Sequence, residues 1–366
     1  MRKRHLRRKL RSRMQSAVTS LKETRGYQRH FQSSYVSQFR RLLRLYGKDN
    51  YTSEEISILG IANPRIPLAE LQQYISKHDL LRMQYSLNDA HYRSLTEDKT
   101  IFYGLCDSFH IPSPTLYAYF SPPGGWLKDG SIVQGQVQWV NYFECLAPRE
   151  FVIKPSLGVY AHGFRMIERQ EQRWRCRSGH TYSSHELYQS LTQDPHYDRF
   201  ILQERVRNHD DLTQVSHSEA LQTVRIVTLM NSKGTPQIIN ALLKIVQGNN
   251  ITDNFAGGDS GNLLANLDIE TGQILAVVGK QNGSLESITH NQQTHTSYLE
   301  FTLPLWKEVK ELALHAATKF SPLQTIGWDI AITQNGPLMI EGNQCWDPGQ
   351  NFFKEGLILR NQMSFR

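Results

Sequence analysis

The stretch from Ile326 to Asn343 constrains the fold more than any other part of the sequence, because it has the pattern of a β-hairpin with polar residues at its open end. Ile330 and Ile332 alternate on one side of the first strand. Asn335-Gly336 supplies the positive-φ turn of a tight hairpin, and Leu338-Met339-Ile340 returns. We therefore predict an antiparallel strand pair.

Oxygen-bearing side chains gather at the open end of this hairpin. Glu341 and Asn343 are two positions apart, so they share one face of their strand. Asp329 joins that face only if the loop holds an odd number of residues or a bulge shifts the register, since a strict two-residue Asn-Gly turn points it the other way. Two carboxylates and an amide oxygen suit Mg²⁺, which proteins bind through carboxylates and substrate phosphates. The alternative is an edge hairpin whose acidic side chains are merely solvated.

Length and composition indicate a globular protein. A chain of 366 residues has room for about two to three domains and a sizeable core. No apolar run approaches the roughly 20 residues that span a bilayer. The four cysteines are scattered without a Cys-x-x-Cys pair, which favours reduced thiols in a cytosolic protein.

The net charge of +7 is unevenly spread along the chain. Residues 1–50 hold 15 Lys and Arg against two acids, a net of +13, which leaves −6 for the remaining residues. The cationic run at residues 1–25 lacks the apolar segment of a secretory signal, although a transit peptide has a similar look. Such arms also bind nucleic acid or anionic membrane, and the simplest alternative is a solvated helical arm.

Helical signals dominate the first 95 residues. Apolar residues from Phe39 to Tyr46 recur at helical spacing, and Thr52-x-x-Glu55 is a capping box. Pro67 is expected to open another helix that runs through Ile75. We predict a basic helical region over residues 1–95 with no visible chemistry.

A lysine ends the apolar strand Phe151–Pro155, and a small-residue loop follows. Ser156, Gly158 and Gly163 belong to this loop, whose backbone N–H groups could fold over phosphates while Lys154 supplies a point charge. The loop is not a Walker motif, because no Gly-Lys-Ser/Thr occurs. An ordinary loop after a strand is the alternative.

Further strands and loops follow. Phe200–Val206, Gln222–Met230 and Gln237–Val246 have strand patterns, and Arg225 and Lys244 lie inside the last two. Buried cations need anions, so structural salt bridges compete with a catalytic role. Four further elements are expected. They are a substrate-facing loop at 249–258 with Asp253, Asn254, Gly257 and Gly258, a hairpin at 262–278, a polar loop at 280–303 with solvent-exposed His290 and His295, and an amphipathic helix from Trp306 to Phe320 packed behind the Ile326–Asn343 hairpin.

The order of these motifs is more specific than any one of them. A helix bearing Lys99 comes first, then the Lys154 loop, a Gln203-Glu204 strand and the Arg225 strand. Asp253 to Gly258 and the Asp329–Asn343 hairpin follow. In this order the sequence resembles the ATP-grasp superfamily over about residues 96–350, and most closely the branch associated with sugar transfer.

The resemblance implies a fold and a set of residue roles. The fold is α+β, with two subdomains (residues 96–200 and 201–366) that clamp ATP between antiparallel sheets, preceded by the basic helical region. The implied roles are these: phosphate and nucleotide contacts by Lys99, Lys154, Ser156, Gly158, Gly163, Gln203, Glu204 and Val206; ribose binding by Asp211 or His209; Mg²⁺ ligation, with Mn²⁺ as an alternative ion, by Asp329, Glu341 and Asn343; catalysis by Arg225 and Lys244; and substrate contacts by Asp253, Asn254, Gly257 and Gly258.

The implied activity is that of a cytosolic, Mg²⁺- and ATP-dependent carboxylate–amine ligase acting through an acylphosphate, with substrates from surface-glycan or natural-product assembly. A kinase acting on a small hydroxyl compound, or a non-catalytic nucleotide-binding platform with an RNA- or membrane-binding arm, are the alternatives. One departure is that the branch usually has Arg where Lys244 stands, and a lysine cannot grip an oxyanion with two parallel hydrogen bonds.

Overall fold

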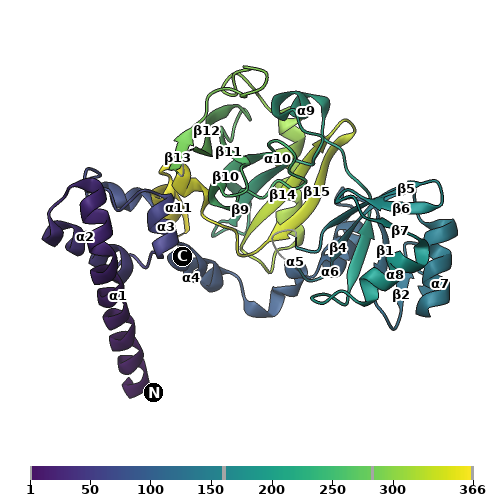
Figure 1. The fold of residues 1–366 in the computed structure, drawn as a ribbon, viewed down its shortest axis with the longest axis horizontal. Helices are drawn as coiled ribbons and strands as arrows, with labels where there is room; N and C mark the ends of the chain where they lie inside the picture. Colours follow the sequence, from purple (N-terminus) through teal and green to yellow (C-terminus); the bar gives the residue numbers. More distant parts are fainter. Residues whose placement is uncertain (1, 159–161, 282–283, 364–366) are drawn as a thin grey trace.

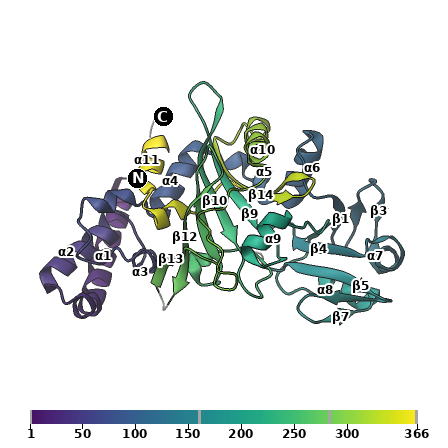
Figure 2. The same ribbon diagram turned by 90° about the horizontal axis from the view of Figure 1, so that it is seen from above.

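Two antiparallel sheets lie side by side, and a helical region adjoins the larger one (Figures 1 and 2). This computed structural model describes residues 2–158, 162–281 and 284–363, with side chains from residue 17 onward. Both views place the large sheet in the middle, the small sheet at one end and the first helices at the other. The predicted α+β class, with helices before the sheets, is confirmed.

The helical region has its own apolar core. Leu42, Leu45 and Ile56 are fully buried in it, and Thr52 caps its helix with the predicted capping box. Its elements are α1 (Arg2–Phe31), α2 (Tyr35–Gly47), α3 (Ser53–Ile58), η1 (Glu70–Gln73), α4 (Lys77–Leu87), η2 (Ala90–Tyr92) and α5 (Ser94–Glu97).

Helix α1 is much longer than its neighbour. Its 30 residues span about 45 Å, whereas the 13 residues of α2 span about 20 Å. The first half of α1 therefore extends beyond α2, and in Figure 1 it runs down to the N-terminus at the bottom of the view. Within the described ranges, no helix is both long enough and apolar enough to cross a bilayer.

The prediction of a helix from Pro67 to Ile75 is wrong. Only the short 3₁₀ helix η1 forms, and the backbone is extended at Tyr74 and again at Ser76, just before α4 begins at Lys77. The side chain of Asn351 accepts a hydrogen bond from the Ile75 N–H (2.9 Å) and donates one to the Ile75 carbonyl (2.6 Å). A partner 276 residues away thus takes the backbone groups that a longer helix would need.

The small sheet has eight strands in the order β3-β2-β1-β8-β4-β5-β6-β7. Large aromatic side chains fill its core, among them Trp139 and Trp174. β8 ends at Gln203 rather than Val206. The next residue, Glu204, is bonded to Thr115: its N–H donates to the Thr115 carbonyl at 2.8 Å, and its carboxylate accepts the Thr115 N–H at 3.0 Å. The elements are β1 (Leu116–Phe120), β2 (Gly125–Leu127), β3 (Ile132–Val133), α7 (Gly135–Asn141), η3 (Tyr142–Leu146), β4 (Glu150–Pro155), β5 (Arg165–Gln170), β6 (Arg173–Cys176), β7 (Thr181–Tyr182), α8 (Ser184–Thr192) and β8 (Phe200–Gln203).

The large sheet has seven strands in the order β13-β12-β11-β10-β9-β14-β15. As predicted, an amphipathic helix, α10, packs against its hairpin strands, and Ile330 and Ile332 are fully buried on that side. The elements are α6 (Lys99–Ser108), α9 (Asp210–Ser216), β9 (Thr223–Met230), β10 (Pro236–Ile245), η4 (Ala256–Gly258), β11 (Leu263–Leu267), β12 (Ile274–Gln281), β13 (Ser284–Ser287), α10 (Trp306–Lys319), β14 (Thr325–Thr333), β15 (Gly336–Asn343), η5 (Gly349–Phe353) and α11 (Gly356–Met363).

Strand β9 shows how the two faces of this sheet differ. Val224 and Ile226 enter the core beneath α10. Because successive side chains alternate, Arg225 and Val227 point to the opposite face. Val227 and Leu229 are buried there in a cluster with side chains of α4 and α11. The end of the face near Arg225 is polar, and the far end is a packing surface.

The hairpin differs from its prediction in the turn and agrees with it in the bulge. Thr333 pairs with Gly336, so Gln334-Asn335 forms the turn, one residue earlier than predicted. A register shift follows: Ile330 pairs with Met339, but Asp329 pairs with Glu341. The extra residue, Ile340, is the bulge that the prediction required to bring Asp329 and Glu341 to one face.

The polar segment at 280–303 is not a loop throughout. β12 continues to Gln281, and β13 pairs with it through the partners Lys280 and Leu285. β13 is an edge strand with exposed residues at three of its four positions, so its sequence lacks the apolar alternation of an inner strand.

Strand β15 is the other edge of the large sheet, and two of its outward backbone groups have partners. The Met339 N–H donates to the Pro112 carbonyl at 2.8 Å. The Tyr103 hydroxyl, from α6, donates to the Ile340 carbonyl at 2.6 Å. Helix α6 and the segment after it thus cover this edge next to the bulge.

Candidate functional site

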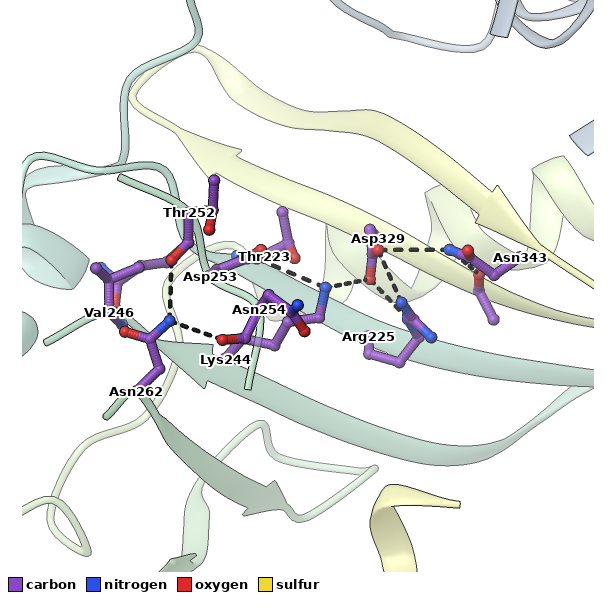
Figure 3. A network of polar contacts seen from close by, with 12 residues as sticks. Thr223, Arg225, Lys244, Val246, Thr252, Asp253, Asn254, Asn262, Asp329 and Asn343 are labelled. Carbon is purple, nitrogen blue, oxygen red and sulfur yellow. Dashed lines mark hydrogen bonds and ion pairs between the residues drawn. The ribbon is translucent and has the colours of Figure 1, made fainter. Parts of the chain in front are cut away.

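Three strands of the large sheet bring opposite charges together on its polar face (Figure 3). Arg225 on β9 donates two hydrogen bonds to Asp329 on β14, from Nε to Oδ1 at 2.6 Å and from a terminal nitrogen to Oδ2 at 2.8 Å. The Lys244 Nζ on β10 lies 3.0 Å from Asp329 Oδ1. Only 7% of the Asp329 side chain is exposed. One buried carboxylate therefore serves two cations.

The pKa shifts of this group follow from burial and pairing. Burial alone raises the pKa of Asp329, but Arg225 and Lys244 outweigh it and hold the pKa near 2. Burial lowers the pKa of Arg225, and the attraction of Asp329 reverses this to a net increase. The carboxylate is therefore ionised, and the guanidinium protonated, throughout the physiological range.

Asp253 extends the charged row at its other end (Figure 3). Its Oδ2 lies 3.6 Å from Lys244 Nζ and accepts hydrogen bonds from the Thr223 N–H, at 3.0 Å, and from the Thr223 hydroxyl. The adjacent loop is fixed by Asn262, whose amide donates to the Thr252 and Asn254 carbonyls, each at 2.9 Å. Lys244 is thus held between two carboxylates that come from a strand and a loop.

Glu341 and Asn343 lie on the same face as Asp329. The Asn343 amide donates to Asp329 Oδ2 at 3.4 Å. Glu341, opposite Asp329 in the strand pair, forms an ion pair with Lys99, whose Nζ lies 3.3 Å from its Oε1. The same ammonium donates to the Gly158 carbonyl at 2.9 Å. Lys99 therefore joins the hairpin to the loop that follows β4.

Lys154, at the end of β4, faces this group from the small sheet. Burial lowers its pKa, and the Lys99 charge lowers it further. The carboxylates of Glu341, Asp253 and Asp329 act in the opposite direction, and the pKa is about 8. Among the described residues, no carboxylate lies within ion-pairing distance of its Nζ. A partly buried ammonium without a direct counter-ion among the described residues is suited to bind an anionic ligand.

The loop after Lys154 is held tightly at both ends, and its middle, residues 159–161, lies outside the described residues. Ser156 is buried and bonded to α6. A side chain at Gly163, where φ is +74°, would approach Pro155 to 2.7 Å and the Tyr197 ring to 3.1 Å. A side chain at Gly158 would come within 3.1 Å of Pro155. The two glycines therefore let the loop fold back over its own strand.

The residues expected around adenine and ribose occupy different surroundings. Gln203 is buried beside Tyr103, and its carbonyl oxygen has no hydrogen-bond partner among the described residues. Val206 is half-buried in the segment after β8. His209 caps α9, its ring accepting the Asp211 N–H at 3.3 Å, and Asp211 is exposed.

The structure brings eight of the predicted residues into one group: Lys99, Lys154, Arg225, Lys244, Asp253, Asp329, Glu341 and Asn343. Gly257 and Gly258 lie elsewhere, against Ile58 of α3 and Lys280 of β12. Glu204 is engaged by the Thr115 backbone.

Oxygen ligands for a hard cation are present, although cations of the protein contact them. The described residues include no cluster of three or more His, Cys, Asp or Glu side chains with metal-binding geometry. Asp329 and Glu341 are nevertheless direct partners on adjacent strands, with the Asn343 amide beside them. This donor set fits Mg²⁺ in its chemistry, and Glu341, at 32% exposure, is the more accessible carboxylate.

Three residues that support the site were not predicted from the sequence. Thr223 anchors Asp253, Tyr103 contacts both Ile340 and Gln203, and Asp98 caps α6 and bonds to Ser156. Asp98 carried a usable signal, since an Asp directly before a predicted helix is a typical N-cap. Thr223 and Tyr103 carried none, because their partners are distant in sequence.

Comparison with known proteins gives one family match. The model of the family described as sugar-transfer associated ATP-grasp matches residues 80–363. No curated protein matches the sequence.

Several solved structures are similar to this chain at low sequence identity. They include N5-carboxyaminoimidazole ribonucleotide synthetase with ADP (11% identity, TM-score 0.43, covering 80% of this chain and 59% of that one) and D-alanine–D-alanine ligase from Coxiella burnetii (12%, 0.39, 76% and 61%). D-Ala:D-Ser ligase VanG from Enterococcus faecalis is similar at 12% identity, with a TM-score of 0.42, covering 76% and 63%. The chain thus spans about three fifths of the length of these proteins.

Proposed function

This chain belongs to the sugar-transfer associated ATP-grasp family, and on that premise we propose that it is an ATP-dependent ligase that joins a carboxylate to an amine. One observation carries the proposal: cations from both sheets and carboxylates of the large sheet converge on one place. Lys154 comes from the small sheet, Arg225, Lys244, Asp329 and Glu341 come from the large one, and the α6 residue Lys99 bridges them.

The proposed nucleotide position lies between the sheets, with its phosphates near Lys99 and Lys154. Phosphoryl transfer requires mainly positioning and neutralisation of charge. The lysines supply fixed positive charge, and Lys154 is not already neutralised by a carboxylate contact among the described residues. Asp329, Glu341 and Asn343 would hold Mg²⁺, which neutralises phosphate charge when bound.

The proposed reaction has two steps. A substrate carboxylate oxygen attacks the γ-phosphorus of ATP, and the bond to the β-phosphate oxygen breaks, which gives an acylphosphate and ADP. The amine nitrogen then attacks the acyl carbon and loses a proton as phosphate leaves. Arg225 and Lys244 are the candidate groups for steadying the transferred phosphoryl oxygens, a role in which their present contacts with Asp329 would loosen.

The experiment uses purified protein, MgATP, a metabolite extract and hydroxylamine, with mass spectrometry of the products. Hydroxylamine captures activated carboxylates, so hydroxamates that require both ATP and enzyme would support the ligase and identify the acid by its mass. The Glu341→Gln variant is the control. Phosphorylated products without hydroxamates would refute carboxylate activation in favour of a kinase. ATP binding without any product in extracts that include lipid and polymer fractions would favour a nucleotide-binding platform.

A further inference from the structure

A hydrogen-bond chain joins the start of the loop after β4 to the N-terminus of α6. The Ser156 hydroxyl donates to Asp98 Oδ1 at 2.8 Å, and the same oxygen accepts the Thr100 N–H at 2.8 Å. The Thr100 and Ser156 hydroxyl oxygens are 2.9 Å apart. Because the Ser156 proton goes to the carboxylate, the Thr100 hydroxyl is the donor in that last contact.

Ser156 uses all of its polar groups to link two parts of the fold. Its N–H donates to the Arg199 carbonyl (2.9 Å), just before β8 of the small sheet. Its carbonyl accepts the Lys99 N–H (3.0 Å), and its hydroxyl reaches Asp98. Ser156 is only 2% exposed, so water cannot readily replace these bonds.

The two elements that Ser156 joins belong to different lobes. β4 and the residue before β8 are part of the small sheet, whereas Phe102 and Tyr103 of α6 lie in the core of the large one. Lys154 lies two residues before Ser156, and the Lys99 N–H is one of the groups bonded to Ser156. The link therefore fixes the separation of the two lysines that face the candidate site.

We propose that Asp98 is a positioning residue, which acts through Ser156 to hold the loop after Lys154 against α6 so that Lys99 and Lys154 bind the same polyphosphate. The inference rests on the proposed function, since it requires that the site binds ATP. Asp98 itself does not contact the nucleotide. Its effect is on the phosphates and not on the nucleoside.

The test is equilibrium binding of ATP and of adenosine to the full chain. Loss of a hydrogen bond to a charged group typically changes an equilibrium about tenfold or more. We expect Ser156→Ala and Asp98→Ala each to raise the Kd for ATP about tenfold. The Kd for adenosine should stay the same as in wild type. Because both variants break the same link, the double variant should also show about a tenfold increase rather than a hundredfold one.

Two controls separate this role from general damage. Asp98→Asn keeps the Oδ1 acceptor for both Thr100 and Ser156, so its ATP affinity should stay within about twofold of wild type. Ser183→Ala removes a different serine cap, that of α8 in the small lobe, and should lower thermal stability without changing ATP affinity.

Three outcomes would overturn the inference. They are unchanged ATP affinity in Ser156→Ala, equal losses for ATP and adenosine, or multiplicative losses in the double variant. If the wild-type protein bound no ATP, the proposed function would fail as well, whereas normal wild-type binding with a silent Ser156→Ala would overturn the positioning role alone.

Discussion

The pKa of Lys154 makes a quantitative prediction about nucleotide binding. An ordinary lysine stays protonated to about pH 10.4, but burial and the neighbouring Lys99 bring the pKa of Lys154 to about 8. If only the ammonium form binds phosphate, the Kd for ATP increases by the factor 1 + 10^(pH − pKa). This factor is about 2 at pH 8 and about 11 at pH 9. The sign is definite: a lowered lysine pKa weakens anion binding as the pH rises.

The assay is isothermal titration calorimetry, in which ATP is titrated into wild type and Lys154→Arg between pH 7 and 9.5. EDTA is present to remove divalent metal ions. An arginine remains charged over this range, so the variant reports the titration of ATP and of all other groups. We expect the ratio of the two Kd values to change about tenfold between pH 7 and 9. Wild type should also take up a proton on binding above pH 8, which is measured in buffers of different ionisation enthalpy. Parallel profiles for the two proteins would refute the reasoning.

Three further predictions concern the carboxylates and the first helix. Asp329→Asn leaves the largely buried Arg225 without its anion and Lys244 with Asp253 alone, so we expect unfolding in urea to show a loss of about 3–5 kcal/mol, and a loss below 1 kcal/mol would contradict the pairing. Glu341→Gln should lower ATP turnover by about two orders of magnitude in a steady-state assay, with the exposed Glu286→Gln on β13 as its matched control. Deleting residues 2–16, which precede the part of α1 that packs on α2, should leave ATP turnover within about twofold of wild type, and loss of turnover in a folded truncation would place the arm in the site.

The sequence predicted local elements of the site well. The cap at Thr52, the strand that carries Lys154 and the helix behind the hairpin were all predicted, because each depends on residues only a few positions apart. The core-facing side of strand β14 followed from the alternation of Ile330 and Ile332. Local patterns of this kind are largely determined by neighbouring residues.

The register of the hairpin could be stated only as a condition. Asp329 and Glu341 face the same way because Ile340 is bulged, and nothing in the residue types requires the bulge at that position. Its surroundings supply the reason: the Tyr103 hydroxyl holds the Ile340 carbonyl, and Arg225 on the neighbouring strand pairs with Asp329. Both partners lie more than 100 residues away, beyond the reach of a local pattern.

The failed helix after Pro67 has a similar cause. Its apolar spacing is helical, but Asn351 binds the backbone of Ile75 on both sides and extends it. The contact from Lys99 to Glu341 likewise joins positions 242 residues apart. Sequence patterns can nominate such residues, and only the tertiary fold brings them together.

The placement of the hairpin at the edge of its sheet has a consequence for self-association. A terminal strand with free backbone groups is a template on which a second molecule can add a strand. On β15 the Met339 N–H donates to the Pro112 carbonyl, and the Ile340 carbonyl accepts the Tyr103 hydroxyl. The bulge at Ile340 also breaks the regular spacing of backbone groups that a second strand would have to match. The strand that carries Glu341 and Asn343 thus stays accessible to a small ligand while it is protected against intermolecular β-sheet growth.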